Sequence, residues 1–329
     1  MRILHISFHK GCQNDIEYIC NYLGYTLEFM IFDDGVTKGN ALYNIGQKRA
    51  QDCWEKYKDY FNSFNIIITS DTTPISRVFL QNNYKNKLII WISNRFDYSD
   101  GASLDCNFPD KDYYELIKSI PFRPNVIFIS NCAFENLYLN LKQINISNLI
   151  VKPIGCISNI YTNTIYTKLE NKNNYFWIPQ YHNETILLNL SNKLNSLNIL
   201  NYNGRHGGLN DLGEFKGIIH IPYAWSTISF FEAIQLGMIY FIPSLDFLIE
   251  LSKIGNFWFQ PPFKKELLYL SEWYNEENNS LFVYFNSWAD LKKKTETINF
   301  IEMKKNILIF AENHKTKYLY IWKKLLDSV

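Results

Sequence analysis

Residues 216–244, KGIIHIPYAWSTISFFEAIQLGMIYFIPS, form the stretch that most limits what this chain can fold into. GIIHIP is a short apolar run rich in β-branched residues, which predicts a buried strand. Ser226 stands where a helix N-cap is expected, and Gly237 closes the helical segment STISFFEAIQLG. MIYFIPS is a second buried strand. This order of elements predicts a parallel sheet, whose ligands bind at the carboxyl ends of the strands.

The helix of this segment carries a carboxylate at a position that suits nucleotide binding. The amino end of a helix offers free N–H groups and a partial positive charge, and the hydroxyls of Ser226 and Thr227 stand there. Glu232 follows at a distance of about 9 Å along the helix, since each residue adds ~1.5 Å. This is close to the distance between the diphosphate and the ribose of a nucleotide. A carboxylate at that position can accept hydrogen bonds from the ribose hydroxyls. An ordinary surface glutamate is the alternative interpretation.

The composition indicates a globular chain without a strong charge bias. Apolar residues make up 47% of the 329 residues, so the chain can bury sizeable cores and is long enough for two domains. The formal net charge is +1, whereas a nucleic-acid-binding domain is normally basic, so no nucleic-acid partner is expected. The sequence lacks a GxGxxG motif, which disfavours a dinucleotide-dependent oxidoreductase.

The cysteines indicate a reducing compartment. The six are irregularly spaced and none form a CxxC pair, so the sequence predicts neither a disulfide framework nor a zinc site. The amino terminus, MRILHISF, predicts a first strand and not a signal peptide. The sequence contains no run of 18 or more apolar residues, so no transmembrane helix is expected. We therefore expect a cytoplasmic protein with no metal site and no cofactor.

The first half of the chain repeats the alternation of strands and helices. Apolar runs at 2–8, 64–71, 87–93 and 126–130 predict buried strands of a doubly wound sheet. Polar residues follow each run and are expected at the ligand edge of that sheet: His9, Asp71, Asn94, Arg95, Asp97, Asn131 and Glu135.

The segment FFEAIQLGMIYFIPS, with the strand, proline and Ser/Thr-bearing turn before it, resembles the nucleotide-sugar-binding segment of GT-B fold glycosyltransferases. Uncharacterised viral and algal members have a similar PY-x-WS and FFE pattern. The resemblance implies an α/β fold of two Rossmann-like doubly wound domains facing a cleft. It also implies that Ser226 and Thr227 hold the donor diphosphate, that Glu232 holds the ribose, and that Tyr223 lies beside them. Many retaining members carry an acid where Ala224 stands, which favours inversion.

The resemblance also divides the chain. An acceptor-binding domain, a linker, a nucleotide-sugar-binding domain and a helix that packs back on the first domain are expected at residues 1–156, 157–174, 175–300 and 301–329. Lys152 at the end of the first domain is placed to reach the diphosphate. Tyr181 and Asn183 lie in the first loop of the second domain, which meets the donor phosphates in GT-B relatives.

An inverting transferase needs a general base that takes the proton of the acceptor hydroxyl. His9, Asp71 and Asp97 are the candidates, and Asp71 is the first choice. The structural alternative is that Arg95 pairs with Asp97 or Asp71 and ties the loops together.

The expected function is a metal-independent glycosyltransferase of glycan biosynthesis. It would pass a sugar from a nucleotide-diphosphate donor to a hydroxyl group of a glycan or glycoconjugate. Two alternatives remain open. One is a nucleotide-sugar epimerase or hydrolase on the same fold. The other is a non-catalytic nucleotide- or glycan-binding module, which the presence of Ala224 in place of an acid keeps open.

Overall fold

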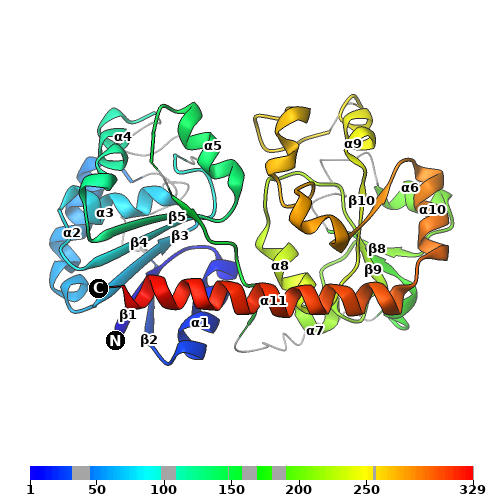
Figure 1. The fold of residues 1–329 in the computed structure, drawn as a ribbon, viewed down its shortest axis with the longest axis horizontal. Coiled ribbons are helices and arrows are strands. Elements are labelled where there is room, and N and C mark those ends of the chain that lie inside the picture. Colours follow the sequence, from blue (N-terminus) through cyan, green and yellow to red (C-terminus); the bar gives the residue numbers. More distant parts are fainter. Residues whose placement is uncertain are drawn as a thin grey trace. The chain divides into compact units, whose positions relative to one another are not determined.

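The computed structural model describes residues 1–31, 45–97, 109–146, 148–157, 169–179, 190–254 and 257–328. The chain forms two compact units (Figure 1). Unit 1 consists of Met1–Ser158 with Lys317–Val329, and unit 2 consists of Asn159–Thr316. Each unit contains one parallel sheet with flanking helices, as the two doubly wound domains of the predicted fold require.

Unit 1 is built on a six-stranded sheet in which all strand pairs are parallel. Its spatial order is β2-β1-β3-β4-β5-β6. The strands are β1 (Arg2–Ile6), β2 (Thr26–Met30), β3 (Ile66–Ser70), β4 (Lys87–Ile92), β5 (Val126–Ser130) and β6 (Leu149–Ile150). Each predicted strand is present, with ends one or two residues shorter than the apolar run in several cases.

Helices cover both faces of this sheet (Figure 1). They are α1 (Lys10–Leu23), α2 (Gln47–Asn62), α3 (Arg77–Gln81), α4 (Lys111–Lys118), α5 (Ala133–Leu141) and the end of α11 (Phe300–Asp327). Leu88 and Ile90 of β4 join the core cluster that contains residues of α2, α3 and α4. Trp91 points to the opposite face and meets Trp322 of α11 edge-on, with ring centroids 5.7 Å apart. Both faces of β4 are therefore buried, which explains its nearly continuous apolar sequence.

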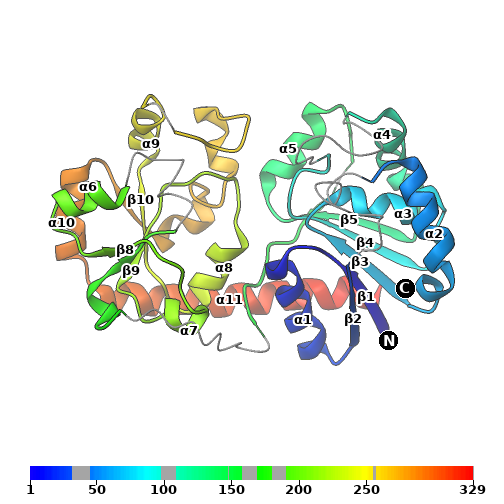
Figure 2. The same cartoon turned by 180° about the vertical axis from the view of Figure 1, so that it is seen from behind.

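Unit 2 is built on a five-stranded parallel sheet with the order β11-β10-β9-β7-β8. Three of its strands, β8, β9 and β10, are labelled in Figure 2. Its strands are β7 (Phe176–Trp177), β8 (Asn201–Tyr202), β9 (Gly217–Ile219), β10 (Tyr240–Pro243) and β11 (Phe282–Phe285). Its helices are α6 (Leu190–Ser196), α7 (Leu209–Leu212), α8 (Ile228–Gln235), α9 (Leu245–Leu251), α10 (Trp288–Thr297) and the first part of α11.

In both sheets, the direction in which successive strands are added reverses at one point. In unit 1 the first and third strands, β1 and β3, lie side by side, and β2 lies beyond β1. In unit 2 the corresponding neighbours are β7 and β9, with β8 beyond β7. Ligands of open α/β sheets bind outside the carboxyl ends of the strands at such a switch point. The fold therefore directs attention to the loops after β1 and β3, and to those after β7 and β9.

The predicted strand-helix-strand segment at 216–244 is present as β9, α8 and β10, with one correction at the start of the helix. Thr227, not Ser226, is the N-cap residue, with an extended backbone at φ −137° and ψ 139°. The other end follows the prediction, because Gly237 has φ +68° and donates to the carbonyl of Ile234, while Met238 donates to that of Ala233. These two bonds form a Schellman motif.

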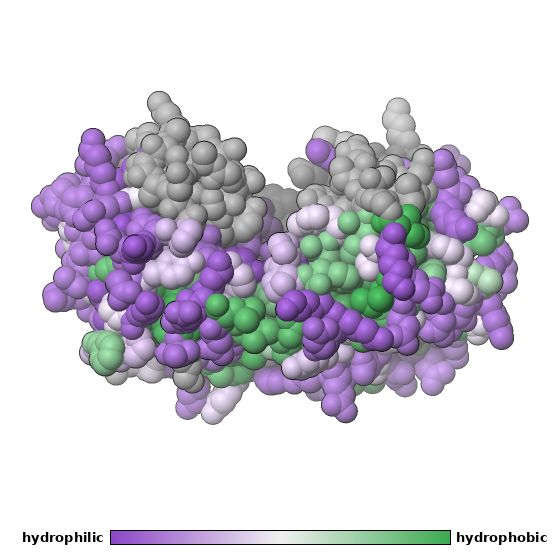
Figure 3. Space-filling view, turned by 90° about the horizontal axis from the view of Figure 1, so that it is seen from above, coloured by the Kyte–Doolittle hydropathy of each residue, from purple (hydrophilic) through white to green (hydrophobic). Residues whose placement is uncertain are grey.

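On the face shown in Figure 3, apolar side chains gather in patches between hydrophilic ones. Among the helices of the described residues, none has both the length and the apolar character needed to cross a membrane.

Candidate functional site

The turn between β9 and α8 in unit 2 is held by hydrogen bonds to the segment that precedes β11. The backbone N–H of Gln260 donates to the carbonyl of Tyr223 at 2.7 Å, and the indole of Trp273 donates to the carbonyl of Ala224 at 2.8 Å. Trp225 is buried, and its indole donates to the carbonyl of Gln260 at 3.1 Å. The turn that carries Tyr223, Ser226 and Thr227 is thus fixed by contacts on both sides.

The amino end of α8 has no side-chain cap. The Thr227 hydroxyl accepts from Ser229 at 3.3 Å and does not bond to a backbone N–H of the first turn. Ser226 Oγ is buried and has no hydrogen-bond partner among the residues that the structure describes. Two other helices of unit 2 are capped, because Ser244 accepts from the N–H of Phe247 and Ser287 from that of Asp290. The first N–H groups of a helix lack intrahelical partners, so this end of α8 can receive an anion.

Glu232 lies on α8 in a partly buried position. Burial raises the pKa of its carboxyl group from 4.5 to about 7, and among the described residues no cation or hydrogen-bond donor offsets this effect. Burial, followed by the charges of Tyr223 and Glu232, raises the pKa of Tyr240 well above its usual value. Tyr223 and Glu232 therefore lie near the same buried phenol. A desolvated carboxylate without a partner is suited to accept hydroxyl groups of a ligand.

Asp71 lies in unit 1, directly after β3 and beside the switch point. Its backbone is left-handed, with φ +70°, which is uncommon for a residue other than glycine and is often found at functional sites. Its N–H donates to Ser93 Oγ at 2.8 Å. The side chain is buried, and this burial raises the pKa of the carboxyl group from 3.8 to about 7.

His9 follows β1 on the other side of this switch point. It is the N-cap residue of α1, and its Nδ1 accepts from the backbone N–H of Cys12 in a long hydrogen bond of 3.4 Å. Desolvation by the surrounding protein lowers the pKa of His9 below its usual 6.5, although part of the residue faces solvent. A neutral imidazole has one acceptor nitrogen. In His9 the helix cap uses that nitrogen.

Asp97 lies beyond β4, and its carboxylate points to tyrosines of α4 and α5. It accepts from Tyr138 at 2.9 Å and from Tyr114, and Lys142 lies 3.5 Å away. Asp97 is thus an anchor between two helices and is surrounded by donors.

Arg95 forms a buried ion pair with Glu135, so the alternative interpretation, in which it pairs with Asp97 or Asp71, is wrong. Its guanidinium also lies 4.4 Å from the ring centroid of Phe134. This aromatic contact and the ion pair place Arg95 against α5. Arg95 is therefore not an ion-pair partner of Asp71.

Three further residues are predicted to bind the donor. Lys152 is buried and belongs to unit 1, two residues after β6. Its segment is fixed by Asp15 of α1, whose carboxylate accepts the backbone N–H groups of Ile154 and Gly155 at 3.0 and 2.7 Å. Tyr181 and Asn183 lie outside the described residues.

Sequence reasoning missed Ser93, which contacts Asp71. It is the last residue of the apolar run KLIIWIS and lies directly after β4. Its position at the end of a predicted strand was a sufficient signal, because the same argument selected Asn94 and Arg95 beside it.

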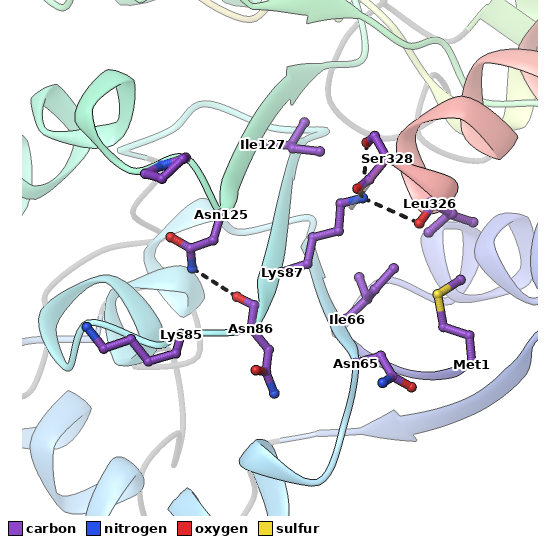
Figure 4. A pocket seen from close by; sticks show the side chains of 11 residues that line it. Met1, Asn65, Ile66, Lys85, Asn86, Lys87, Asn125, Ile127, Leu326 and Ser328 are labelled. Carbon is purple, nitrogen blue, oxygen red and sulfur yellow. Dashed lines mark hydrogen bonds between the residues drawn. The ribbon is translucent and has the colours of Figure 1, made fainter.

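A pocket of about 840 Å³ opens at the opposite edge of the unit 1 sheet, at the amino ends of β3, β4 and β5 (Figure 4). Lys87 points across it and donates to the carbonyls of Leu326 and Ser328 at the end of α11. Asn125 donates to the carbonyl of Asn86 at 2.9 Å on the other side. The Lys87 bonds dock the end of α11. The pocket lies away from the ligand edge of the sheet.

Comparison with known proteins identifies the fold. No protein-family model and no curated protein sequence matches the chain. Among solved structures, the chain is similar to CalG4, the calicheamicin glycosyltransferase, with a TM-score of 0.50 and 8% identity over 99% of this chain and 98% of that chain. The protein has the GT-B fold.

Two further GT-B structures are similar at lower TM-scores. The spinosyn forosaminyltransferase SpnP gives 0.46 at 10% identity and covers 99% of this chain and all of that one. The spinosyn rhamnosyltransferase SpnG, complexed with thymidine diphosphate, gives 0.45 at 9% identity with the same coverage. At such identities the GT-B likeness describes the fold, and the function must be argued from the site.

Proposed function

We propose that this GT-B protein is a glycosyltransferase that moves a sugar from a nucleoside-diphosphate donor to a hydroxyl group of a glycan, with inversion at the sugar. The observation that carries the proposal is the combination on α8 of an uncapped amino end with Glu232, a desolvated carboxyl group that lacks a cationic partner among the described residues. The GT-B fold shared with CalG4 supports the same class of reaction.

Unit 2 supplies the donor site in this proposal. The diphosphate sits at the amino end of α8, where backbone N–H groups and the hydroxyls of Ser226 and Thr227 receive it. Charge builds up on the diphosphate as the sugar leaves, and oriented N–H dipoles stabilise that charge without a metal ion. Glu232 accepts the two ribose hydroxyls. Tyr223 lies beside this site.

In the proposal Lys152, Tyr181 and Asn183 also contact the donor diphosphate. They supply a cation and two polar side chains for the phosphate oxygens, which suits a charge that grows during the reaction.

Unit 1 supplies the acceptor site and the general base. Asp71 is the proposed base, because it lies at the switch point, has a left-handed backbone and has a pKa of about 7. A base with a pKa near the working pH is ionised and still holds a proton well. His9 uses its acceptor nitrogen in the cap of α1, and Asp97 is engaged by two tyrosines, so both are weaker candidates.

A thermal-shift screen with the diphosphates of the common nucleosides tests the donor assignment. A ligand that binds only the folded state raises the melting temperature by mass action, so one nucleoside diphosphate should stabilise the protein above the others. Incubation of the matching nucleotide sugars, with and without oligosaccharide acceptors, then identifies the reaction. Product formed only with an acceptor supports transfer. Free sugar or an epimerised donor formed without an acceptor identifies a hydrolase or an epimerase and contradicts the proposal.

A further inference from the structure

One serine joins the ends of three neighbouring strands at the ligand edge of unit 1. Ser93, after β4, accepts the backbone N–H of Asp71, after β3, on its hydroxyl at 2.8 Å. Its carbonyl accepts from the side-chain amide of Asn131, after β5, at 3.2 Å. The thiol of Cys12 on α1 lies 3.4 Å from the same hydroxyl. Elements that follow four strands thus meet at Ser93.

The bond from Asp71 is the important one of these contacts. Asp71 lies beyond Ser70, the last paired residue of β3, and its N–H donates to a side chain and not to the sheet ladder. A buried N–H needs an acceptor, and the Ser93 hydroxyl provides one. A non-glycine residue keeps a left-handed backbone only where its surroundings fix it. Ser93 therefore acts on the conformation of Asp71 through a specific bond.

We propose that Ser93 is the positioning residue for Asp71, because its hydroxyl holds the left-handed backbone that keeps the Asp71 carboxyl group buried at the switch point. Only the catalytic consequence of this inference rests on the proposed function. The positioning itself is a property of the folded chain and can be measured without a substrate.

The pKa of the Asp71 carboxyl group shows whether this group is buried, because of the groups that surround it. The titratable groups on the elements around it include Cys12, Asp15, His5, His9, Arg95 and Glu135. Cys12 and His5 are neutral at pH 7, because burial raises the pKa of Cys12 to about 12 and lowers that of His5 to about 3. Arg95 and Glu135 pair with each other. Desolvation thus sets the pKa of Asp71, and a carboxyl group released to water would titrate near 3.8.

The test measures the titration of Asp71 by carboxyl ¹³C NMR, with the signal assigned by its loss in Asp71→Asn. In Ser93→Ala the proton affinity of Asp71 should fall by about tenfold or more, since one pKa unit is a factor of ten. Ser93→Thr keeps the hydroxyl and should keep the wild-type titration. Ser76→Ala is the matched control, because this buried serine bonds to the carbonyl of Thr73 and not to Asp71.

An unchanged titration in Ser93→Ala would overturn the positioning role. If Ser93→Ala does not fold, Ser93→Cys keeps the volume with a weaker acceptor, and an unchanged titration there contradicts the proposal equally. A separate result would contradict the proposed function. If the Asp71→Asn variant still transfers sugar, Asp71 is not the base, and the NMR result on the position of Asp71 is unaffected. Where Asp71 is the base, Ser93→Ala should lower kcat and shift the acidic limb of the pH profile while the KM for the donor stays unchanged.

Discussion

At the scale of single residues, Asp71 and Glu232 share an uncommon property. Asp71 is buried and Glu232 is partly buried, burial raises the pKa of each carboxyl group to about 7, and no cation among the described residues offsets that rise. Structural carboxylates in this chain are different, as Asp15 accepts two backbone N–H groups and Asp97 accepts two phenols. Carboxyl groups that are costly to ionise and lack such partners are candidates for contact with a ligand.

Asp71 should make the protein less stable as the pH rises. Its pKa in the folded state, about 7, lies above the ordinary 3.8, so the folded state binds its proton more tightly than the unfolded chain does. The free energy of unfolding therefore falls as the pH rises from about 4 through 7. Asp71→Asn cannot ionise, so its stability relative to wild type should increase by about 1–3 kcal/mol between pH 5 and pH 8. Chemical denaturation at the two pH values measures this difference. A constant difference would show that Asp71 is not desolvated.

Glu232 should make nucleotide binding depend on pH. The ribose hydroxyls stabilise the ionised carboxylate, so binding lowers the pKa of Glu232 from about 7 and releases a proton. The affinity for a nucleoside diphosphate should therefore rise several-fold from pH 6 to pH 8. Glu232→Gln retains the shape and removes the charge, and any pH dependence that remains in this variant comes from the nucleotide. Calorimetry at both pH values separates the contribution of Glu232 from that of the nucleotide. The same change of affinity with pH in wild type and variant would contradict the role of Glu232.

At the scale of elements, α8 differs from its neighbours in the way it begins. Ser287 caps α10 through a bond to the N–H of Asp290 at 3.1 Å, whereas Thr227 makes no such bond at the start of α8. Loss of a capping hydroxyl costs about 1 kcal/mol. Ser287→Ala should therefore destabilise the protein by about that amount, and Thr227→Ala by only a few tenths of a kcal/mol. Denaturation curves of the two variants measure this contrast. Equal losses would mean that Thr227 caps α8 after all and leaves no open end for a phosphate.

The same helix shows how far the sequence predicts local structure. The apolar runs predict β9 and β10, and Gly237 predicts the end of α8, because a left-handed terminal residue favours glycine. The start was misplaced by one residue, since Ser226 and Thr227 are equally good N-caps by residue type. Backbone contacts with the segment around Gln260, more than thirty residues later, hold the turn and decide between them.

At the scale of the whole molecule, the parallel sheets and the strand ends at the ligand edge follow from the sequence, whereas the partners at those ends do not. Asp71 and Asp97 have the same sequence signal, a carboxylate after an apolar run. Only the structure shows that tyrosines of α4 and α5 engage Asp97 while Ser93 holds the backbone of Asp71. These contacts join residues far apart in the chain, and a positive φ at a non-glycine residue has no reliable sequence signal.

The switch-point rule applies to each sheet separately. It selects the loops after β1 and β3 in unit 1 and the loop after β9 in unit 2, which contain His9, Asp71 and the turn before α8. One chain thus carries two ligand edges, as the proposed transfer between a donor and an acceptor requires. The pocket at the amino ends of β3, β4 and β5 is at the wrong edge for this chemistry.

Calorimetric titration of Glu232→Ala with the nucleoside diphosphate that stabilises the wild type most tests the central claim directly. Hydrogen bonds to a charged group contribute about 1.5–3 kcal/mol each, so the affinity should fall by roughly tenfold to a hundredfold or more. Glu250→Ala, which changes an exposed glutamate on α9 of the same unit, should bind like the wild type. Equal affinity of Glu232→Ala and wild type, with both folded, would contradict the account.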